Sequence, residues 1–203
     1  MQQQNRSIND LLDGLRVDMS PKYQENMLHD IPETEVIDRV LFILERCMDK
    51  TVLDIGCDGF LHPKILEVAK KAYGVDRIKC DFPNFTQQDI SNGIGNVPSD
   101  VDLIVCGEVV EHLSNPGIFL DSLKPYNVEK IFTVPNAFSN IGDGCIRRGQ
   151  ENVNAEHVAW YSYYTFNNLL RRHGLSVKEF YWCDNPERIN DNGFNEGLVF
   201  VTN

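Results

Sequence analysis

The chain has 203 residues, of which 42% are apolar and 10% aromatic, and this composition fits one ordinary globular domain with a sizeable core. Nineteen Lys and Arg oppose 30 Asp and Glu, so the formal net charge is −11. Because nucleic-acid binders draw affinity from Lys and Arg that neutralise phosphates, this balance disfavours a nucleic-acid partner and favours a small or neutral one.

The six cysteines are scattered along the chain, and no two of them form a C-x-x-C pair. Several fall in apolar runs, where small reduced cysteines are common. No apolar run approaches the roughly 18 residues of a membrane span, and the N-terminus lacks the basic and then apolar pattern of a signal peptide. We therefore expect a cytoplasmic protein with no membrane partner. The oligomeric state stays open.

The first 32 residues are mostly polar and carry one apolar rhythm, formed by Ile8, Leu11, Leu12 and Leu15. This spacing predicts a short helix. We therefore expect an N-terminal helical arm over residues 1–32, which either covers a ligand site or packs as a simple extension.

The main domain is expected over residues 33–203 and begins with apolar positions at helical spacing. Pro32 and Glu33 suit the first turn of a helix there. The apolar positions of that helix are Val36, Val40, Ile43, Leu44 and Cys47.

Residues 51–63 read TVLDIGCDGFLHP and predict a buried strand, a glycine turn and a helix opened by Pro63. This arrangement is the first half of a βαβ nucleotide-binding unit. Asp54 stands at the carboxyl end of the strand, where open α/β sheets bind ligands. A carboxylate there suits a ligand with an ammonium or sulfonium group better than a diphosphate, which requires a cradle of backbone N–H groups.

A second acidic position follows in the register of a nucleotide site. Asp76 ends a predicted strand over 72–76 and lies 20 residues beyond Gly56. An acidic residue at that distance can accept hydrogen bonds from both ribose hydroxyls. A short third strand is expected to end at Asp89 and Ile90.

The rest of the chain alternates strand-like and helix-like segments. Residues 102–106 form a continuous apolar run, as expected for a central parallel strand. Residues 137–155 have weak periodicity and predict a long loop, which in a compact domain is usually functional or mobile. The other predicted elements are a helix from Pro116, a strand over 130–135, a helix between Ser162 and Gly174, and strands over 175–182 and 198–202.

Four motifs, in the order of the chain, resemble those of the class I S-adenosylmethionine (SAM) methyltransferases. The first is D-x-G-x-G-x-G in that family and reads DIGCDGF here, so Asp58 and Phe60 replace its second and third glycines. The others are E-V-x-E-H-L at 108–113, T-x-P-N at 133–136 and H-x-x-x-Y-S at 157–162. The subgroup with these motifs includes ubiquinone-type O-methyltransferases, many sugar and natural-product methyltransferases, and small-RNA 2′-O-methyltransferases.

The resemblance covers residues 33–203 and implies an α/β fold. Its Rossmann-like sheet would have seven mostly parallel strands, a terminal antiparallel β-hairpin and helices on both faces. The resemblance also implies that Asp54 and Gly56 hold the methionine half of SAM and that Asp76 holds the ribose. Asp89 would receive the adenine N6 amine, and Glu108 would border both cofactor and acceptor. The full set of expected cofactor contacts is Asp54, Gly56, Cys57, Asp58, Gly59, Asp76, Arg77, Asp89, Ile90, Gly107 and Glu108.

A hydroxyl acceptor needs its proton removed, or its pKa lowered, near neutral pH. His112 and His157 are the candidates for this catalytic role, together with the neighbouring Glu111. In the RNA-methylating members of the family, E-x-x-E-H and a distal His bind a divalent metal. The residues that match that metal pattern are Glu108, Glu111, His112 and His157. A metal site, a metal-free histidine base and a purely orienting role remain open.

The expected reaction is O-methylation of a small molecule or sugar by in-line methyl transfer. Four aromatic residues follow His157 and would either stack on the acceptor or belong to the core. They are Trp160, Tyr161, Tyr163 and Tyr164. Arg147 and Arg148 would hold an anionic group of the acceptor or be solvated loop charges. The histidines expected at the surface or at helix ends, without a role, are His29, His62 and His173.

Two other functions stay open on the sequence alone. The first is a non-catalytic SAM-binding or scaffold protein in which Asp58 and Phe60 have spoiled the glycine loop. The second is a dinucleotide-dependent oxidoreductase, which is disfavoured because G-x-G-x-x-G is absent after the first strand of the nucleotide-binding unit.

Overall fold

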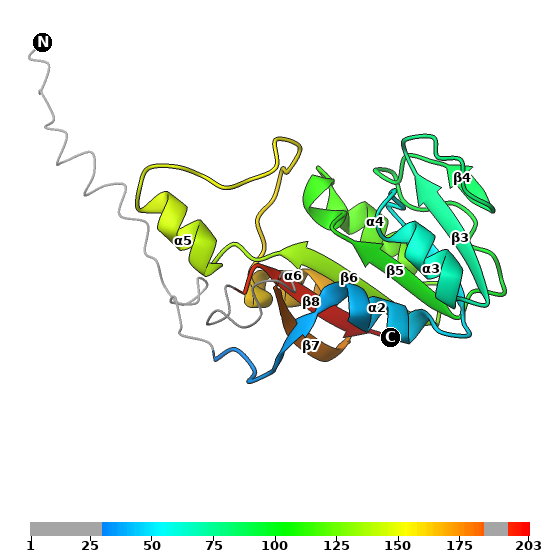
Figure 1. The fold of residues 1–203 in the computed structure, drawn as a ribbon, viewed down its shortest axis with the longest axis horizontal. Helices are drawn as coiled ribbons and strands as arrows, with labels where there is room; N and C mark the ends of the chain where they lie inside the picture. The colour runs from blue at the N-terminus through cyan, green and yellow to red at the C-terminus, as the bar shows by residue number, and fades with distance from the viewer. Residues whose placement is uncertain (1–29, 185–194) are drawn as a thin grey trace, which may run out of the picture. The chain divides into compact units, whose positions relative to one another are not determined.

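The computed structural model describes residues 30–184 and 195–203, and these residues form an eight-stranded sheet between two layers of helices (Figure 1). The strands lie in the order β1-β7-β8-β6-β5-β2-β3-β4. Neighbouring strands are parallel except where β8 runs antiparallel to β6 and β7. The expected fold class, a Rossmann-like and mostly parallel sheet with a terminal antiparallel hairpin, is confirmed.

The order of the elements along the chain positions the loops that follow each strand. The strands are β1 (Val36–Asp38), β2 (Thr51–Ile55), β3 (Lys71–Asp76), β4 (Phe85–Gln87), β5 (Leu103–Gly107), β6 (Glu129–Pro135), β7 (Val177–Asp184) and β8 (Gly197–Thr202). The helices are α2 (Arg39–Cys47), α3 (His62–Val68), the 3₁₀ turn η1 (Val110–His112), α4 (Pro116–Leu123), α5 (Asn140–Ile146) and α6 (Tyr163–Arg172). In the described ranges, none of these helices is long and apolar enough to cross a membrane.

The two faces of the sheet pack against different helices, because successive side chains of a strand point to opposite faces. Along β2, Val52 belongs to the apolar core that includes Ile43 of α2 and Ile65 of α3. Leu53 and Ile55 belong to the other core, which α4 and α6 cover. Residue 54 therefore shares the face of residue 52, and its side chain points toward α3.

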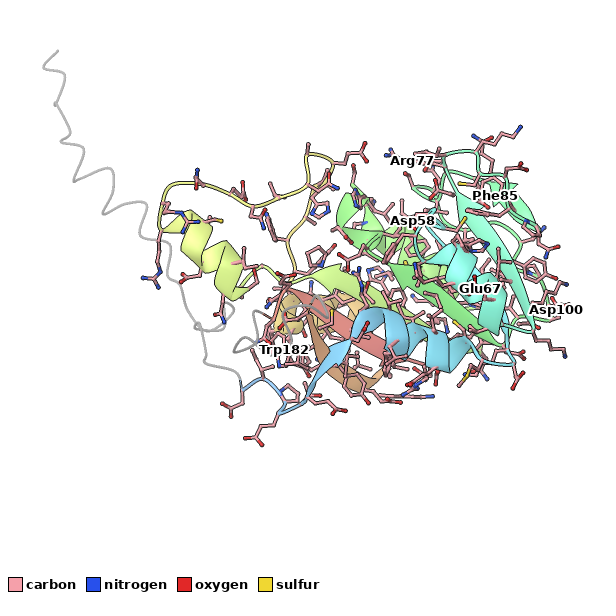
Figure 2. The ribbon with its side chains drawn as sticks, in the orientation of Figure 1. Asp58, Glu67, Arg77, Phe85, Asp100 and Trp182 are labelled. Carbon is pink, nitrogen blue, oxygen red and sulfur yellow. The ribbon has the colours of Figure 1, made fainter. Side chains whose placement is uncertain are left out.

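The carboxyl ends of β2, β3 and β5 lie at one edge of the sheet, since these strands are parallel neighbours. Figure 2 shows Asp58 and Arg77 at this edge, with Glu67 and Asp100 toward the opposite one. Open α/β sheets bind ligands at the edge where the strands end. The loops after these three strands are therefore where a site is expected.

The helix predicted from Glu33 begins later than its apolar spacing indicates. Val36–Asp38 forms the strand β1 instead, which pairs in parallel with β7 and adds an eighth strand to the seven expected. The helix starts at Arg39 because Oδ1 of Asp38 accepts hydrogen bonds from the N–H groups of Val40 and Leu41, at 2.8 and 3.1 Å. An Asp that caps the first turn in this way marks a helix N-terminus.

Two further expectations need correction. The segment 137–155 is not all loop, since Ser139 caps the short helix α5, which has no buried residue. Strands and helices do not alternate throughout, because no helix separates β3, β4 and β5 within the described residues.

The helix between Ser162 and Gly174 is confirmed as α6, with a capping box at Ser162. Residues 1–29 of the predicted arm, His29 among them, lie outside the described residues.

Candidate active site

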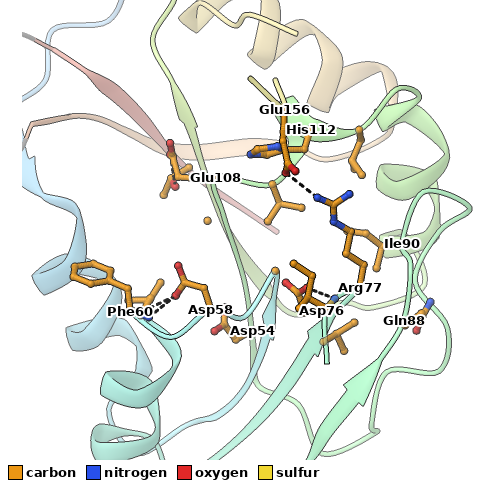
Figure 3. A pocket seen from close by; sticks show the side chains of 18 of the residues that line it. Asp54, Asp58, Phe60, Asp76, Arg77, Gln88, Ile90, Glu108, His112 and Glu156 are labelled. Atoms are coloured by element: carbon orange, nitrogen blue, oxygen red, sulfur yellow. Dashed lines mark hydrogen bonds and ion pairs between the residues drawn. The ribbon is translucent and has the colours of Figure 1, made fainter. Parts of the chain in front are cut away.

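A cavity of about 330 Å³ opens at the carboxyl ends of β2, β3 and β5 (Figure 3). Nine of the eleven predicted cofactor residues line it, namely Asp54, Gly56, Asp58, Asp76, Arg77, Asp89, Ile90, Gly107 and Glu108. The other two, Cys57 and Gly59, lie outside the lining. The N–H of Cys57 donates to the carbonyl of Val75 at 3.2 Å, so this residue ties the loop to β3.

The loop between β2 and α3 depends on one glycine and one carboxylate. Gly56 has φ +77°, and a Cβ built on it would lie 2.2 Å from Cγ2 of Val109, so no other residue fits there without rearrangement. Oδ1 of Asp58 accepts hydrogen bonds from the N–H groups of Phe60 and Leu61, at 2.9 and 2.8 Å. Asp58, which replaces a glycine of the family motif, therefore stabilises the turn through its side chain.

Two carboxylates at the far side of the cavity are held by turns of their own loops. Oδ1 of Asp76 accepts a hydrogen bond from the N–H of Ile78 at 2.6 Å. Oδ1 of Asp89 accepts one from the N–H of Ser91 at 2.9 Å. Hydrogen bonds from Ser91 lower the pKa of Asp89, so this carboxyl is ionised at neutral pH.

The lining of the cavity is strongly acidic. It contains six carboxylates, those of Asp54, Asp58, Asp76, Asp89, Glu108 and Glu156, and two guanidinium groups, those of Arg39 and Arg77. Both guanidinium groups are already paired, Arg39 with Glu108 at 2.8 Å and Arg77 with Glu156 at 2.7 Å. The remaining charge favours a ligand that carries a positive group.

Glu108 is bonded through its carboxylate to Arg39 and Thr133. Its φ is +56°, a left-handed conformation that is uncommon for a residue other than glycine. Its Oε1 accepts a hydrogen bond from Oγ1 of Thr133 at 2.9 Å and pairs with Arg39. Strained residues of this kind cluster at functional sites. Glu108 lines the cavity directly after the end of β5.

Glu111, His112 and His157 come together beside the cavity. One ligand atom from each lies within 4.8 Å of the others. The two imidazole rings meet edge to face with centroids 4.6 Å apart, and Nε2 of His157 lies 3.9 Å from Oε1 of Glu111. Glu108 is not part of this group, so the structure brings together three of the four predicted metal ligands.

Burial changes the protonation of this group. Glu111 is fully buried, and neither of its carboxyl oxygens has a hydrogen-bond partner. Desolvation, with a smaller effect of Glu108, raises the pKa of Glu111 to about 8. Burial and the neighbouring His112 lower the pKa of His157, which is therefore neutral near pH 7.

The aromatic residues after His157 divide between core and surface. Tyr161 packs against Phe166 with ring centroids 4.9 Å apart, and Tyr163 packs against Phe180 at 4.6 Å. Trp160 is 38% exposed and meets the ring of His157 at 6.5 Å. Tyr164 is 42% exposed. Of the four, Trp160 is placed to contact a ligand near His157.

The other polar residues singled out by the sequence lie away from this group. Arg147 pairs with Asp143 at 2.8 Å, and Arg148 donates to Sγ of Cys145. His173 bonds Asp121 at a helix end, as expected. His62 is at a helix end as expected, since it is the first residue of α3, but it is fully buried and does not lie at the surface.

Arg39, Val109 and Glu156 also line the cavity, although none of them was among the predicted site residues. Val109 lies within the motif at 108–113, and Arg39 has no local signal in the sequence. Arg39 reaches Glu108 because α2 begins where Asp38 caps it. Glu156 directly precedes the motif histidine His157, which is the one clue that could have indicated its position.

No protein-family model matches the sequence. Among curated proteins, the mitochondrial ubiquinone biosynthesis O-methyltransferase of Schizosaccharomyces pombe is 29% identical over an alignment of 164 residues that covers 68% of this chain. The match spans 57% of that relative, little more than half of its length.

Solved structures with similar folds include the small RNA methyltransferase HEN1, with a TM-score of 0.60 and 19% identity over 88% of this chain and 27% of that one. A SAM-dependent methyltransferase from Aquifex aeolicus has a TM-score of 0.58 and 17% identity, over 81% of this chain and 89% of that one. The N-methyltransferase NodS from Bradyrhizobium japonicum, in complex with S-adenosylhomocysteine, has a TM-score of 0.56 and 18% identity, over 81% and 83%.

Proposed function

We propose that this chain, which has the fold of the class I SAM-dependent methyltransferases, is an active methyltransferase with SAM bound in the cavity at the ends of β2, β3 and β5. One observation carries the proposal. Nine residues chosen from motif positions far apart in the sequence line one acidic cavity. The curated relative and the neighbours of similar fold support the same class of enzyme.

The residues of the cavity fit SAM in charge and in the hydrogen-bonding groups that they offer. The sulfonium and the ammonium of SAM are cations, and the carboxylates of the lining exceed its guanidinium groups. Asp76 would hold the ribose hydroxyls and Asp89 the adenine, each presented by a turn that fixes its carboxylate. Gly56 lets the loop approach Val109, which lines the same cavity, because a Cβ there would lie 2.2 Å from Cγ2 of Val109. When bound, SAM supplies a methyl group already attached to a good leaving group.

We further propose that the acceptor is a hydroxyl of a small molecule or sugar, which approaches from the side of His157. A neutral imidazole can accept the proton that such a hydroxyl must lose. His157 is mostly unprotonated at neutral pH because burial lowers its pKa. Glu111 and His112 would orient that ring, since both lie against it. A net charge of −11 disfavours RNA as the acceptor.

A divalent metal is a second arrangement for the same group. The donor set fits a transition metal, because two imidazoles and a carboxylate are common ligands and both oxygens of Glu111 are without hydrogen-bond partners. Glu111, His112 and His157 would hold the ion, which would lower the pKa of the acceptor hydroxyl. Glu108 would join them only by giving up its bonds to Arg39 and Thr133.

We also propose a cytoplasmic location. All six cysteines are unpaired thiols, as in a reducing compartment. The curated relative is mitochondrial, so localisation of a tagged full-length protein is the test that separates these compartments.

Isothermal titration with SAM and S-adenosylhomocysteine tests the binding step. The wild type should bind both ligands, and Asp76→Ala should weaken them at least tenfold. Asp100→Ala is a matched control, because Asp100 lies at the opposite edge of the sheet, paired with Lys71. Absence of binding by the wild type would overturn the proposed function.

Turnover and the metal are tested separately. Transfer of a labelled methyl group to a panel of hydroxylated small molecules and sugars, with and without EDTA, should give a product for at least one acceptor. Loss of turnover in EDTA that added metal restores would favour the metal arrangement over the metal-free base. Tight SAM binding without turnover on any acceptor would instead favour a non-catalytic SAM-binding protein.

A further inference from the structure

Asp54 and His62 form a buried pair beneath the loop between β2 and α3. Nδ1 of His62 donates a hydrogen bond to Oδ2 of Asp54 at 2.9 Å, and the two side chains are 0% and 3% exposed. Asp54 is the fourth residue of β2, and His62 is the first residue of α3. The bond therefore joins the end of a strand to the start of the next helix and closes a ring around residues 55–61.

The imidazole is enclosed on its other sides. The ring of Phe82 lies 4.8 Å away, centroid to centroid. A Cβ built on Gly74 of β3 would lie 3.2 Å from Nε2 of His62 and 2.7 Å from Sγ of Cys57, so a glycine is needed to leave room for both side chains. Nε2 itself is buried and has no hydrogen-bond partner. The Asp54 bond is thus the one that fixes the orientation of this ring.

The pair also determines the state of Asp54. Burial raises the pKa of Asp54, and the hydrogen bond from His62 opposes that increase. Asp58 and Asp76 are the other charged groups that act on this carboxyl, and both raise its pKa further. Without the imidazole, Asp54 would be a buried carboxylate among other carboxylates, which is unfavourable. It would then turn away or become protonated.

Asp54 and Gly56 lie in the lining of the cofactor cavity, and His62 does not. Any effect of His62 on a bound cofactor must therefore pass through Asp54 or through the course of the loop. The same loop has lost two glycines of the family motif, at Asp58 and Phe60. Side-chain hydrogen bonds stabilise it instead, because Asp58 accepts from the N–H groups of Phe60 and Leu61 and His62 bonds to Asp54.

We propose that His62 is a positioning residue for cofactor binding, which orients Asp54 and holds the β2–α3 loop in its binding conformation. This inference rests on the proposed function, because it concerns the same cavity. It predicts that His62 governs affinity for the cofactor and leaves the acceptor-side group at Glu111 unchanged.

The test compares three variants by titration with S-adenosylhomocysteine, a readout that does not require turnover. His62→Leu keeps apolar volume and removes the donor, and we expect it to weaken binding by about 10- to 100-fold, the range for loss of a hydrogen bond to a charged group. His62→Asn retains an N–H donor near the position of Nδ1 and should recover most of that loss. His173→Leu removes a second His–Asp bond, 2.7 Å long and outside the cavity, and should leave affinity unchanged.

A purely structural role would lower the melting temperature of His62→Leu and His62→Asn alike, without the recovery of affinity in the Asn variant. Equal affinity of folded His62→Leu and wild type would overturn the proposal. If His62→Leu does not fold, His62→Asn and Asp54→Ala decide the question. An affinity of His62→Asn for S-adenosylhomocysteine within about threefold of the wild type supports the proposal. A loss of affinity as large as that of Asp54→Ala overturns it. Failure of the wild type to bind would count against the proposed function alone.

Discussion

Nε2 of His157 lies 3.9 Å from Oε1 of Glu111, although the two residues come from distant loops. The main chain makes the same connection, since the N–H groups of Val158 and Ala159 donate to the carbonyl of Glu111 at 2.9 and 3.2 Å. The loop that carries His157 is therefore fixed against η1 at the residue whose carboxyl faces its imidazole. One short turn after β5 sets both the position and the electrostatic environment of this histidine.

Glu111→Gln should stabilise the protein at pH 8 and have little effect at pH 4. The pKa of Glu111 is raised from 4.5 to about 8 in the folded state. A raised pKa means that the folded state binds the Glu111 proton more tightly than the unfolded state does. The stabilisation that this proton gives the folded state is therefore fully present below pH 4.5 and is lost as the pH rises toward 8. The slope is at most about 1.4 kcal/mol per pH unit. Urea unfolding of the wild type and Glu111→Gln between pH 4 and pH 8 measures the free energy of unfolding of each. The same pH dependence in both proteins would contradict the raised pKa of Glu111.

His157→Ala should reduce turnover by about 10²- to 10⁴-fold, the usual contribution of a general base. The reason is loss of the neutral imidazole, whose pKa burial and His112 hold below the ordinary value of 6.5. In the wild type, activity should therefore persist as the pH falls to 6.5 and decline only below it. The pH profile of kcat/KM measures this decline at low pH, the acid limb of the profile. His173→Ala is the control, and an unchanged acid limb in His157→Ala would exclude His157 as the base.

The sequence alone predicted the parts of the site that depend on local spacing. The strand, turn and helix over 51–63 and the position of Asp76 follow from short-range patterns, and parallel strands bring such loops to one edge. Asp54, Gly56 and Asp76 therefore line the cavity as expected. His157 lies beside Glu111 because the main chain after it is hydrogen-bonded to η1, a contact that local spacing does not indicate.

Contacts between elements could not be predicted, because they depend on how helices sit on the sheet. His62 resembles a solvated polar residue at a helix start, and only the packing of α3 over β2 and β3 buries it against Asp54. Arg39 reaches Glu108 because the helix starts three residues later than Val36. The cap at Asp38 sets the start of the helix at Arg39. The apolar spacing does not mark this start, because it already includes Val36, which belongs to the strand β1.

Arg77→Ala should change the unfolding free energy by less than about 1 kcal/mol, because exposed ion pairs contribute little. The side chains of Arg77 and Glu156 are 62% and 63% exposed, although their charged atoms lie 2.7 Å apart. The pair joins the loop after Asp76 to the loop that holds His157, so we expect its effect in the KM for SAM and in the salt dependence of that KM. Steady-state kinetics between low and high salt measure it. The double variant Arg77→Glu/Glu156→Arg reverses both charges and should restore the wild-type salt dependence. If it does not, the ion pair between these residues is not the cause of that salt dependence.

Gly56→Ala should be more destabilising than Gly149→Ala, although both glycines have a left-handed backbone, with φ +77° and +70°. A left-handed conformation alone costs a residue with a Cβ about 1–2 kcal/mol, and this is the whole cost expected at Gly149, where a Cβ meets nothing within 4 Å. At Gly56 the Cβ would lie 2.2 Å from Cγ2 of Val109, so the loop or η1 must also shift. Denaturant unfolding gives the two free energies, and titration with S-adenosylhomocysteine should show loss of affinity in Gly56→Ala alone. The contrary result is equal destabilisation of the two variants, with cofactor affinity intact in both. That result would mean that the side chain of Val109 moves aside without cost. The close contact between the β2–α3 loop and Val109 would then not shape the cavity.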